Sequence, residues 1–241
     1  MTDEVLFISD CHVDSSKPEV SSNLLDFLQN RAKNARFLYI LGDLFETWIG
    51  DEDHEPANES IIDGLKALSK NTEILFLAGN RDFLLGDETA KDIDLTIIND
   101  PTVIQLGKHR VALLHGDSLC TDDTEYQAFR RMVRSPEWQT QFRLKPLTER
   151  RAIAASLRAK SLAAMSEKTM DIMDVNSEAV SNCFTQLSVN FIIHGHTHRP
   201  AVHQYANNQR RIVLGDWNPH PSYLSWDSTQ GFKLIDSRVK D

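Results

Sequence analysis

Seven side chains of the kinds that bind metal ions stand in five short polar motifs of this sequence. The seven candidates are Asp10, His12, Asp43, Asn80, His115, His196 and His198. Their donor atoms are carboxylate and amide oxygens and imidazole nitrogens, with no thiolate among them. This mixture suits Mn²⁺, Fe, Ni²⁺ or Zn²⁺ better than Cu(I). The carboxylate of Asp43 has two oxygens, so it is able to bridge two cations.

A site for two bound cations indicates hydrolysis of a phosphate ester or anhydride. Two metal ions about 3.5–4 Å apart form a general arrangement for phosphoryl hydrolysis, in which they neutralise phosphate oxygens and orient the attacking water. One motif alone is weak evidence, because Gly-Asp and Gly-Asn pairs are common in turns. Five motifs in one order, each after a candidate strand, predict a two-metal phosphoesterase.

Each motif directly follows a short apolar run. The runs are 5–8, 37–41, 74–78, 111–114 and 191–193. Continuous runs of this length, rich in Ile, Leu, Val and Phe, are typical of strands buried on both faces of a sheet. Apolar residues at helical spacing in 23–28 and 61–68 lie between runs, which predicts an α/β layered core. Ligands of such sheets bind beyond the carboxyl ends of the strands, and every motif falls at that edge.

The local spacing of the motifs carries geometric expectations. In an extended backbone, residues i and i+2 point the same way, so we expect Asp10 and His12 to face one metal together. The glycine before Asp43 permits a sharp turn out of the strand. Asp82 and Asp117 stand two residues from candidate ligands, where we expect them to orient ligating imidazoles.

The middle of the chain has a different pattern. Residues 121–179 carry no strand signal, and 126–133 and 152–158 have apolar residues at helical spacing. We therefore expect a phosphoesterase core of residues 1–120 and 180–241, with residues 121–179 inserted as a helical cap over the active site. Lysine and arginine are concentrated in this cap although the formal net charge of the chain is −9. A basic cap suits an anionic substrate, but a solvated helix face is the better explanation for any single basic residue.

Three strand-like runs follow the last motif. They are 211–214, 223–226 and 232–235, separated by Pro219, Pro221 and Gly231. This pattern predicts that the three runs complete a second, mostly antiparallel sheet.

Composition and length narrow the classes of function. The 241 residues fit one large domain, and the net charge of −9 disfavours a nonspecific nucleic-acid binder. Three scattered cysteines argue against a disulfide framework and for a reducing, cytoplasmic setting. The first residues lack a signal-peptide pattern, and no apolar run approaches the roughly 20 residues needed to cross a bilayer. We expect a soluble protein, or one attached to a membrane surface, with no obligate protein partner evident.

The series D-x-H, GD, GN, HG and G-H-x-H resembles the motifs of calcineurin-like metallophosphoesterases, from Asp10 to His198. The resemblance implies an α/β fold, a two-sheet sandwich flanked by helices, with a dinuclear metal site. The residues implied for one metal are Asp10, His12, Asp43 and His198. The residues implied for the other are Asp43, Asn80, His115 and His196, so that Asp43 bridges the two ions.

One position departs from the usual pattern of that superfamily. Most members have a histidine after the motif asparagine, where it assists the leaving group, whereas this chain has Arg81 after Asn80. An arginine stays protonated throughout the neutral range, so it cannot serve as a general acid. It does donate paired hydrogen bonds to phosphate and stabilises developing charge. This change favours a good leaving group, and so a diphosphate rather than an alkyl monoester.

The GNRD motif, the basic insertion and the length together resemble a narrower family, the bacterial UDP-2,3-diacylglucosamine diphosphatases of lipid A biosynthesis. Further matching stretches are 44–51, 115–123 and 159–161. The resemblance implies an acylated nucleotide-sugar substrate and water attack at its α-phosphorus, giving UMP and 2,3-diacylglucosamine 1-phosphate (lipid X). It implies two Mn²⁺ ions per chain, with other divalent metals possible. It also implies a cytoplasmic protein held peripherally on the inner membrane.

The same resemblance implies which residues touch the substrate. The lipid-phosphate contacts it implies are Asn80, Arg81, Asp123, Ser161, Lys168 and His196. Of these, Arg81, Asn80 and His196 would act in catalysis. Apolar residues of the cap would line an acyl pocket, although most of them are as well explained by packing of the cap on the core.

Two other functions stay open on the sequence alone. A dinuclear phosphoesterase acting on a soluble nucleotide or a phosphoprotein would carry the same seven ligands, but it would not need a cap with apolar faces. A non-enzymatic scaffold is disfavoured because every ligand position is intact.

Overall fold

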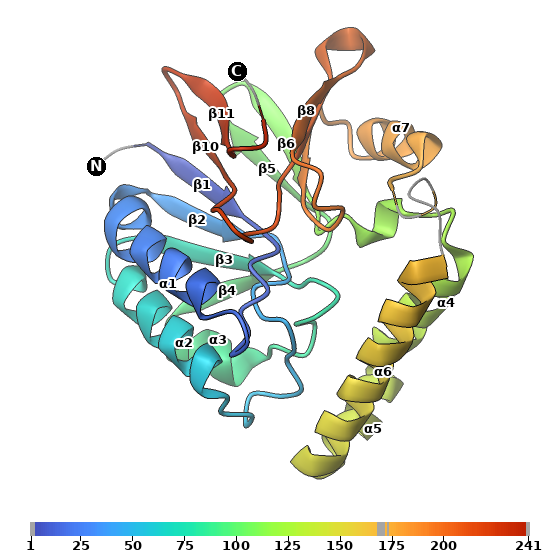
Figure 1. Cartoon of the computed structure of the whole chain (residues 1–241). Coiled ribbons are helices and arrows are strands. Elements are labelled where there is room, and N and C mark those ends of the chain that lie inside the picture. The colour runs from blue at the N-terminus through green and yellow to red at the C-terminus, as the bar shows by residue number, and fades with distance from the viewer. Residues whose placement is uncertain (1–2, 168–171, 173, 240–241) are drawn as a thin grey trace.

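The protein folds as two sheets packed face to face with helices outside them, in a computed structural model that describes residues 3–167, 172 and 174–239 (Figure 1). The strands are β1 (Val5–Ile8), β2 (Phe37–Ile40), β3 (Glu73–Leu77), β4 (Leu95–Ile98), β5 (Thr102–Leu106), β6 (His109–Leu113), β7 (Phe191–His194), β8 (Ala201–Gln204), β9 (Arg210–Val213), β10 (Tyr223–Asp227) and β11 (Gly231–Ile235). The helices are α1 (Pro18–Asp26), α2 (Pro56–Ser69), α3 (Asp87–Ile93), α4 (Thr124–Val133), α5 (Pro136–Arg143), α6 (Leu147–Glu167) and α7 (Ser177–Gln186).

The first sheet has the strand order β11-β10-β1-β2-β3-β4. Strands β1 to β4 run parallel, and β10 joins β1 in antiparallel pairing. Three of the strands predicted from apolar runs are therefore confirmed as β1, β2 and β3. Helices α1, α2 and α3 cover the outer face of this sheet (Figure 1). In α2, Pro56 begins the helix, and Ile61, Leu65 and Leu68 form a buried stripe toward the sheet.

The second sheet has the order β5-β6-β7-β9-β8, with β6, β7 and β9 parallel in its centre. The prediction for the last three runs is wrong in part, because only β9 joins this sheet. The other two, β10 and β11, extend the first sheet instead, where Ser225 pairs with Leu6 of β1. Pairing with β1 places Leu224 and Trp226 in the layer between the sheets, where both side chains are buried.

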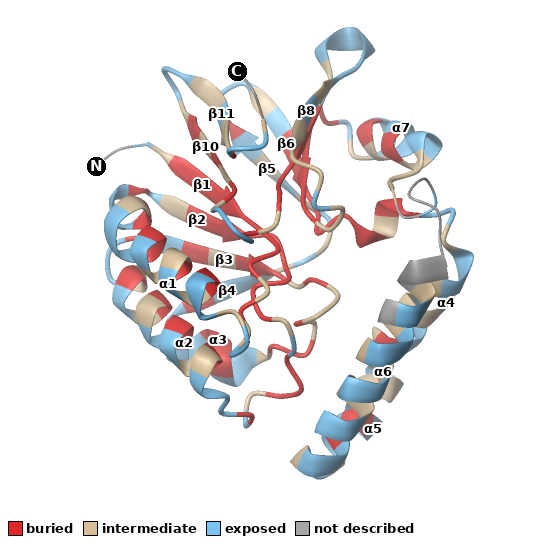
Figure 2. Cartoon of the chain, in the orientation of Figure 1, coloured by how far each residue is buried: buried red, intermediate tan, exposed pale blue. Residues whose placement is uncertain are grey.

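The core has two faces because side chains alternate along each strand. On β1, Val5 and Phe7 enter the cluster between the two sheets, while Leu6 and Ile8 pack toward the outer helices. All four side chains are buried, as expected for a strand covered on both faces. Figure 2 shows the same burial along the strands and over the inner sides of α1 and α2.

Helices α4, α5 and α6 lie to one side of the sheets, and α6 is largely exposed (Figures 1 and 2). Phe142 of α5 is buried in the outer core cluster, and Trp138 and Ile153 pack against it. The division into a core and a cap of residues 121–179 stays a prediction. Helix α7 begins inside that range, and its Val180 and Phe184 pack on the second sheet. In the described part of the chain, no helix has the length and apolar character needed to cross a membrane.

Candidate metal centre and active site

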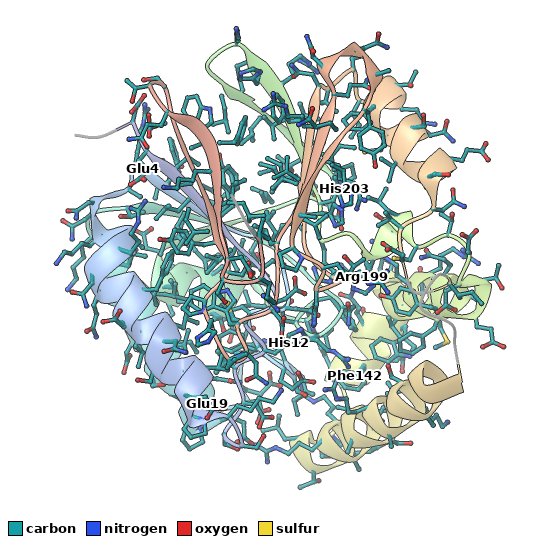
Figure 3. The ribbon with its side chains drawn as sticks, turned by 45° about the horizontal axis from the view of Figure 1, so that its top comes forward. Glu4, His12, Glu19, Phe142, Arg199 and His203 are labelled. Carbon is teal, nitrogen blue, oxygen red and sulfur yellow. The ribbon has the colours of Figure 1, made fainter. Side chains whose placement is uncertain are left out.

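The seven candidate ligands lie in loops that begin where buried strands end. Asp10 and His12 follow β1, Asp43 follows β2, Asn80 follows β3, and the remaining candidates follow β6 and β7. Because β1, β2 and β3 are parallel, their carboxyl ends meet at one edge of the first sheet. Figure 3 shows His12 near the centre of the molecule, at the ends of both sheets and on the side where Phe142 of the cap lies.

The backbone at these ligands is unusual, because five of the seven have a positive φ. The five are Asp10 (54°), His12 (50°), Asp43 (53°), His196 (66°) and His198 (54°). Left-handed backbone at a residue other than glycine is strained, by an amount of order 1–3 kcal/mol, and such residues gather at functional sites. The strain persists only where surrounding contacts over-determine the loop.

The expectation of an extended backbone at Asp10 and His12 is therefore wrong. Strand β1 ends at Ile8, and both residues lie in the loop beyond it. Their amides donate to neighbouring carbonyls of the next loop: Asp10 N–H to Gly42 at 3.1 Å and His12 N–H to Asp43 at 2.9 Å. The two side chains converge because hydrogen bonds join the two loops, and not because side chains alternate along a strand.

One group of candidate ligands forms around Asp10. Its Oδ1 atom lies 3.3 Å from Nε2 of His198 and 3.8 Å from Nε2 of His12. The two imidazole Nε2 atoms are 3.2 Å apart. Nitrogens bound about 2.1 Å from one ion lie roughly 3–3.4 Å apart, so this separation fits a shared cation. Oδ1 of Asp10 is buried and has no hydrogen-bond partner among the described residues, which leaves it available to such an ion.

The second group forms around Asn80. Its Oδ1 atom lies 3.0 Å from Nε2 of His115 and 2.9 Å from Nδ1 of His196. Asp43 lies between the two groups, because its Oδ2 atom is 3.7 Å from Nε2 of His12 and 3.7 Å from Nε2 of His115. The structure thus brings all seven predicted side chains together in two adjoining sets. Their assignment as ligands stays a prediction, and the donor atoms fit a pair of divalent cations.

The electrostatics of this cluster also suit cations. Burial opposes protonation of His115, but Asp43 and Asp10 outweigh it and raise the pKa of His115 to about 9. A fully buried imidazole that stays protonated reports an excess of negative charge around it. Burial and the neighbouring His115 lower the pKa of His196 to about 4, so His196 is neutral and its ring is able to bind a metal.

The loops around the cluster are held by close packing and by buried hydrogen bonds. Gly42 has φ of +85°, and a Cβ there would lie 2.8 Å from Nδ1 of His115, so the predicted sharp turn at this glycine is confirmed. Nδ1 of His115 donates to the carbonyl of Leu41 at 2.9 Å, which turns Nε2 toward Asn80. A hydrogen bond from one imidazole nitrogen to a backbone carbonyl commonly orients the other nitrogen toward a metal.

The expected roles of Asp82 and Asp117 are corrected by their contacts. Asp82 is fully buried and accepts hydrogen bonds from the amides of Gly79 (2.8 Å) and Leu44 (2.7 Å), so it ties two ligand loops together rather than orienting an imidazole. Asp117 accepts from Nε of Arg130 at 2.8 Å, which anchors α4 beside the metal loops. The hydrogen bonds that both carboxylates form among the described residues therefore join backbone or α4 groups.

Glu46 is a site residue that the motif analysis missed. Its Oε2 lies 3.0 Å from Nδ1 of His12, and its Oε1 lies 2.5 Å from Nη2 of Arg158 and 3.9 Å from Nε of Arg81. One carboxylate therefore contacts a candidate ligand, the arginine of the GNRD motif and an arginine of α6. The only sequence signal was its place in the matching stretch 44–51.

Tyr126 of α4 is a second missed residue. Its ring stacks on that of His196, with centroids 5.9 Å apart, and its hydroxyl donates to Asp117 at 2.9 Å. Asp123 caps α4 by accepting from the amide of Tyr126 at 3.0 Å. Ser161 lies half-buried on α6, and Lys168 lies outside the described residues. The proposed lipid-phosphate contacts at these last three positions stay predictions.

Comparison with known proteins agrees with this geometry. A family model described as "Calcineurin-like phosphoesterase" matches residues 4–200. A protein named UDP-2,3-diacylglucosamine hydrolase from Aromatoleum aromaticum is 46% identical over 226 residues, covering 92% of each chain. A protein of the same name from Cellvibrio japonicus is 47% identical over 233 residues, and the match covers 95% of this chain and 97% of the relative.

Solved structures support the fold. An archaeal phosphodiesterase superposes with a TM-score of 0.51 over 96% of this chain and 98% of its own, at 14% identity. Similarity at that identity speaks for the two-sheet α/β architecture alone. The family model spans all five motifs and most of the chain. The chain belongs to the calcineurin-like phosphoesterase family.

Proposed function

We propose that this protein hydrolyses the diphosphate of UDP-2,3-diacylglucosamine at the α-phosphorus, giving UMP and 2,3-diacylglucosamine 1-phosphate. The observation that carries the proposal is similarity along nearly the whole chain. Relatives of that name are 46–47% identical over more than 90% of both chains, so the match includes the helices beside the site as well as the metal loops.

The seven side chains supply a site for two divalent cations, and we propose Mn²⁺ as the metal. When bound, such ions lower the pKa of water and offset the negative charge of phosphate oxygens. Asn80 and His196 are in contact at the second group, and we propose that they hold the phosphate that leaves. Arg81 and Arg158 add two guanidinium groups at Glu46, and both are suited to stabilise charge on a departing phosphate.

Leaving-group protonation is unnecessary in this scheme. The departing group is a sugar phosphate, which is stable as an anion near neutral pH and does not require a general acid. Arg81 therefore contributes charge and paired hydrogen bonds rather than a proton. This division of roles explains how a site with arginine at that position is suited to a phosphoric anhydride.

The cap offers an apolar surface for the acyl chains. Phe83 lies beside Trp138 with ring centroids 6.2 Å apart, and Trp138 stacks on Phe142 at 4.8 Å. Trp138 and Phe83 are only partly buried, so part of their apolar surface is open to a ligand. An acyl chain laid on this surface would remove apolar area from water, at about 25 cal/mol per Å².

We also propose that the protein sits peripherally on the cytoplasmic face of the inner membrane. Two large apolar side chains project from the cap, with Leu144 74% exposed and Met132 50% exposed. Arg131 and Arg143 stand beside them in the chain and are also exposed. Basic residues near an anionic lipid surface contribute about 1 kcal/mol each. A Leu144→Glu variant should sediment less with anionic vesicles than the unaltered protein does.

An isotope experiment tests the proposed reaction directly. Hydrolysis of UDP-2,3-diacylglucosamine in H₂¹⁸O, with Mn²⁺ present, should place one ¹⁸O atom in UMP and none in the lipid phosphate, as read by mass spectrometry. Label in the lipid phosphate would contradict attack at the α-phosphorus. UDP-N-acetylglucosamine is the matched substrate without long acyl chains, and equal turnover of the two would favour a soluble nucleotide substrate instead.

A further inference from the structure

Glu46 lies in the loop after β2, beside the loop that carries His12, and backbone hydrogen bonds fix the two loops against each other. The amide of Val13 donates to the carbonyl of Leu44 at 3.0 Å, and the amide of Glu46 donates to the carbonyl of Val13 at 3.0 Å. Val13 and Phe45 are paired as a short parallel bridge. This pairing holds Glu46 next to His12, where the side chain of Glu46 is only 12% exposed.

The two imidazole nitrogens of His12 meet different groups. Nε2 lies among the candidate ligands, 3.2 Å from Nε2 of His198 and 3.7 Å from Oδ2 of Asp43. When Nε2 binds a cation, the proton of the neutral ring is on Nδ1, where it needs an acceptor. Nδ1 is buried and has no aligned hydrogen bond in the part of the chain that the structure describes. Oε2 of Glu46 lies 3.0 Å from it, which is within hydrogen-bonding distance.

The surroundings of Glu46 favour its ionised form. Nη2 of Arg158 lies 2.5 Å from Oε1 of Glu46, and Nε of Arg81 lies 3.9 Å from the same oxygen. Two guanidinium groups at this distance stabilise a carboxylate even where it is mostly buried. An ionised carboxylate that accepts the N–H of an imidazole makes the other ring nitrogen a better metal ligand and fixes its direction.

His115 in the second group of candidate ligands shows what Glu46 adds. Nδ1 of His115 donates to the carbonyl of Leu41 at 2.9 Å, so a neutral backbone group orients that ring. The ring of His12 has a carboxylate in the corresponding place. The two candidate metal sites therefore differ in the charge behind one imidazole, and this charge is carried by a side chain that a substitution is able to remove.

We propose that Glu46 is a positioning residue, which holds the ring of His12 with Nε2 toward the metal and so raises the affinity of one of the two metal sites. The inference rests on the proposed function, which supplies the pair of Mn²⁺ ions. Glu46 acts through His12, so its removal changes how tightly one ion is bound and leaves the other site as it was.

Calorimetric titration with Mn²⁺, in the absence of substrate, tests this role. In Glu46→Ala we expect one of the two Mn²⁺ affinities to fall by about tenfold, the lower end of the effect that loss of a ligand-orienting group has, while the other affinity stays unchanged. Glu46→Gln has the same shape and keeps one oxygen that is able to accept the N–H of His12. It should therefore recover part of the lost affinity.

Glu52→Ala is the matched control. Glu52 is also a glutamate between β2 and α2 that pairs with an arginine of α6, in this case Arg150, and the contacts of the described residues do not join it to His12. Its removal should leave both Mn²⁺ affinities unchanged. A loss of Mn²⁺ affinity in Glu52→Ala equal to that in Glu46→Ala would show a general effect of detaching α6 and would overturn the proposed role.

Three other outcomes would overturn the role of Glu46. They are unchanged Mn²⁺ affinities in Glu46→Ala, no recovery of affinity in Glu46→Gln, and no Mn²⁺ binding by the unaltered protein. Because no substrate is present in these titrations, a failure of the unaltered protein to hydrolyse UDP-2,3-diacylglucosamine is a separate result, and it would overturn the proposed function instead.

Discussion

The metal loops and the helices beside them are built in opposite ways. In the loops, Asp10 and Asp43 are at most 2% exposed, and hydrogen bonds between the backbones of neighbouring loops hold their strained conformations. The helices α4 to α6 are largely exposed, and charged contacts such as Arg130 with Asp117 attach them to the core. Rigid loops suit chemistry that needs fixed ligand positions, whereas a lightly attached cap suits a substrate with long chains.

Glu46 connects the two regions. It touches His12 in the loops and Arg158 in α6, so displacement of α6 changes the charge beside a candidate ligand. Substitutions in the loops should therefore act on metal content and turnover, and substitutions in the cap should act on substrate affinity. A loop substitution that changed only substrate affinity, or a cap substitution that changed metal content, would contradict this assignment.

Replacement of the bridging carboxylate should have the largest effect. Asp43→Ala removes the group between both ligand sets, and we expect activity to fall by well over a hundredfold, since even residues that only orient ligands alter activity by about 10–100-fold. Manganese content per chain, measured by mass spectrometry, should fall below two. Asp87→Asn at an exposed position of α3 is the matched control. Two bound metals in Asp43→Ala would refute the bridge.

Arg81 tests whether charge stabilisation can be separated from metal binding. Arg81→Ala should lower kcat by about a hundredfold, as loss of one preorganised donor to a transition state does. Its manganese content should stay at two per chain, because the guanidinium contacts Glu46 and no candidate ligand directly. Loss of both metals in this variant would contradict the role that we assign to Arg81.

The pH dependence of the metal-free protein tests the charge of the loops. The pKa of His115 is about 9 in the folded chain and about 6.5 when unfolded, so its protonation stabilises the fold fully below pH 6.5. That contribution is lost as pH rises through 9. We expect the Tm of EDTA-treated protein to fall between pH 6.5 and 9, and the Mn²⁺-loaded protein to change less. A Tm that rises over this range in the EDTA-treated protein would contradict the assignment.

Trp138 should give the smallest effect, and one confined to affinity. Trp138→Leu keeps an apolar side chain but removes the ring that stacks on Phe142, and we expect KM for the diacylated substrate to rise by several-fold while kcat stays the same. A substrate with short acyl chains should show a smaller change in KM. If kcat falls by as much as KM rises, the cap takes part in the chemistry and the division fails.

Much of the candidate site was predictable because its signals are local. Short apolar runs predicted β1, β2, β3, β6 and β7, and polar motifs at their ends predicted where seven side chains gather. Arg81 in place of histidine is equally plain in the sequence, and its part in favouring a phosphoric anhydride stays a prediction. The strand positions and the gathering of the seven side chains are confirmed, because strand burial and parallel order depend on residue type and spacing. The roles of these side chains as metal ligands stay predictions.

Other features of the site depend on contacts between segments that are distant in the chain. The pairing of β10 with β1, the left-handed loops at Asp10 and His12, and the link through Glu46 all join residues that are far apart in the chain. No periodicity in the sequence marks such contacts, because each one is chosen by the packing of both partners at once. Residue types and their spacing at the strand ends were enough to predict the cluster of candidate ligands, whereas tertiary packing sets how α6 reaches that cluster through Glu46.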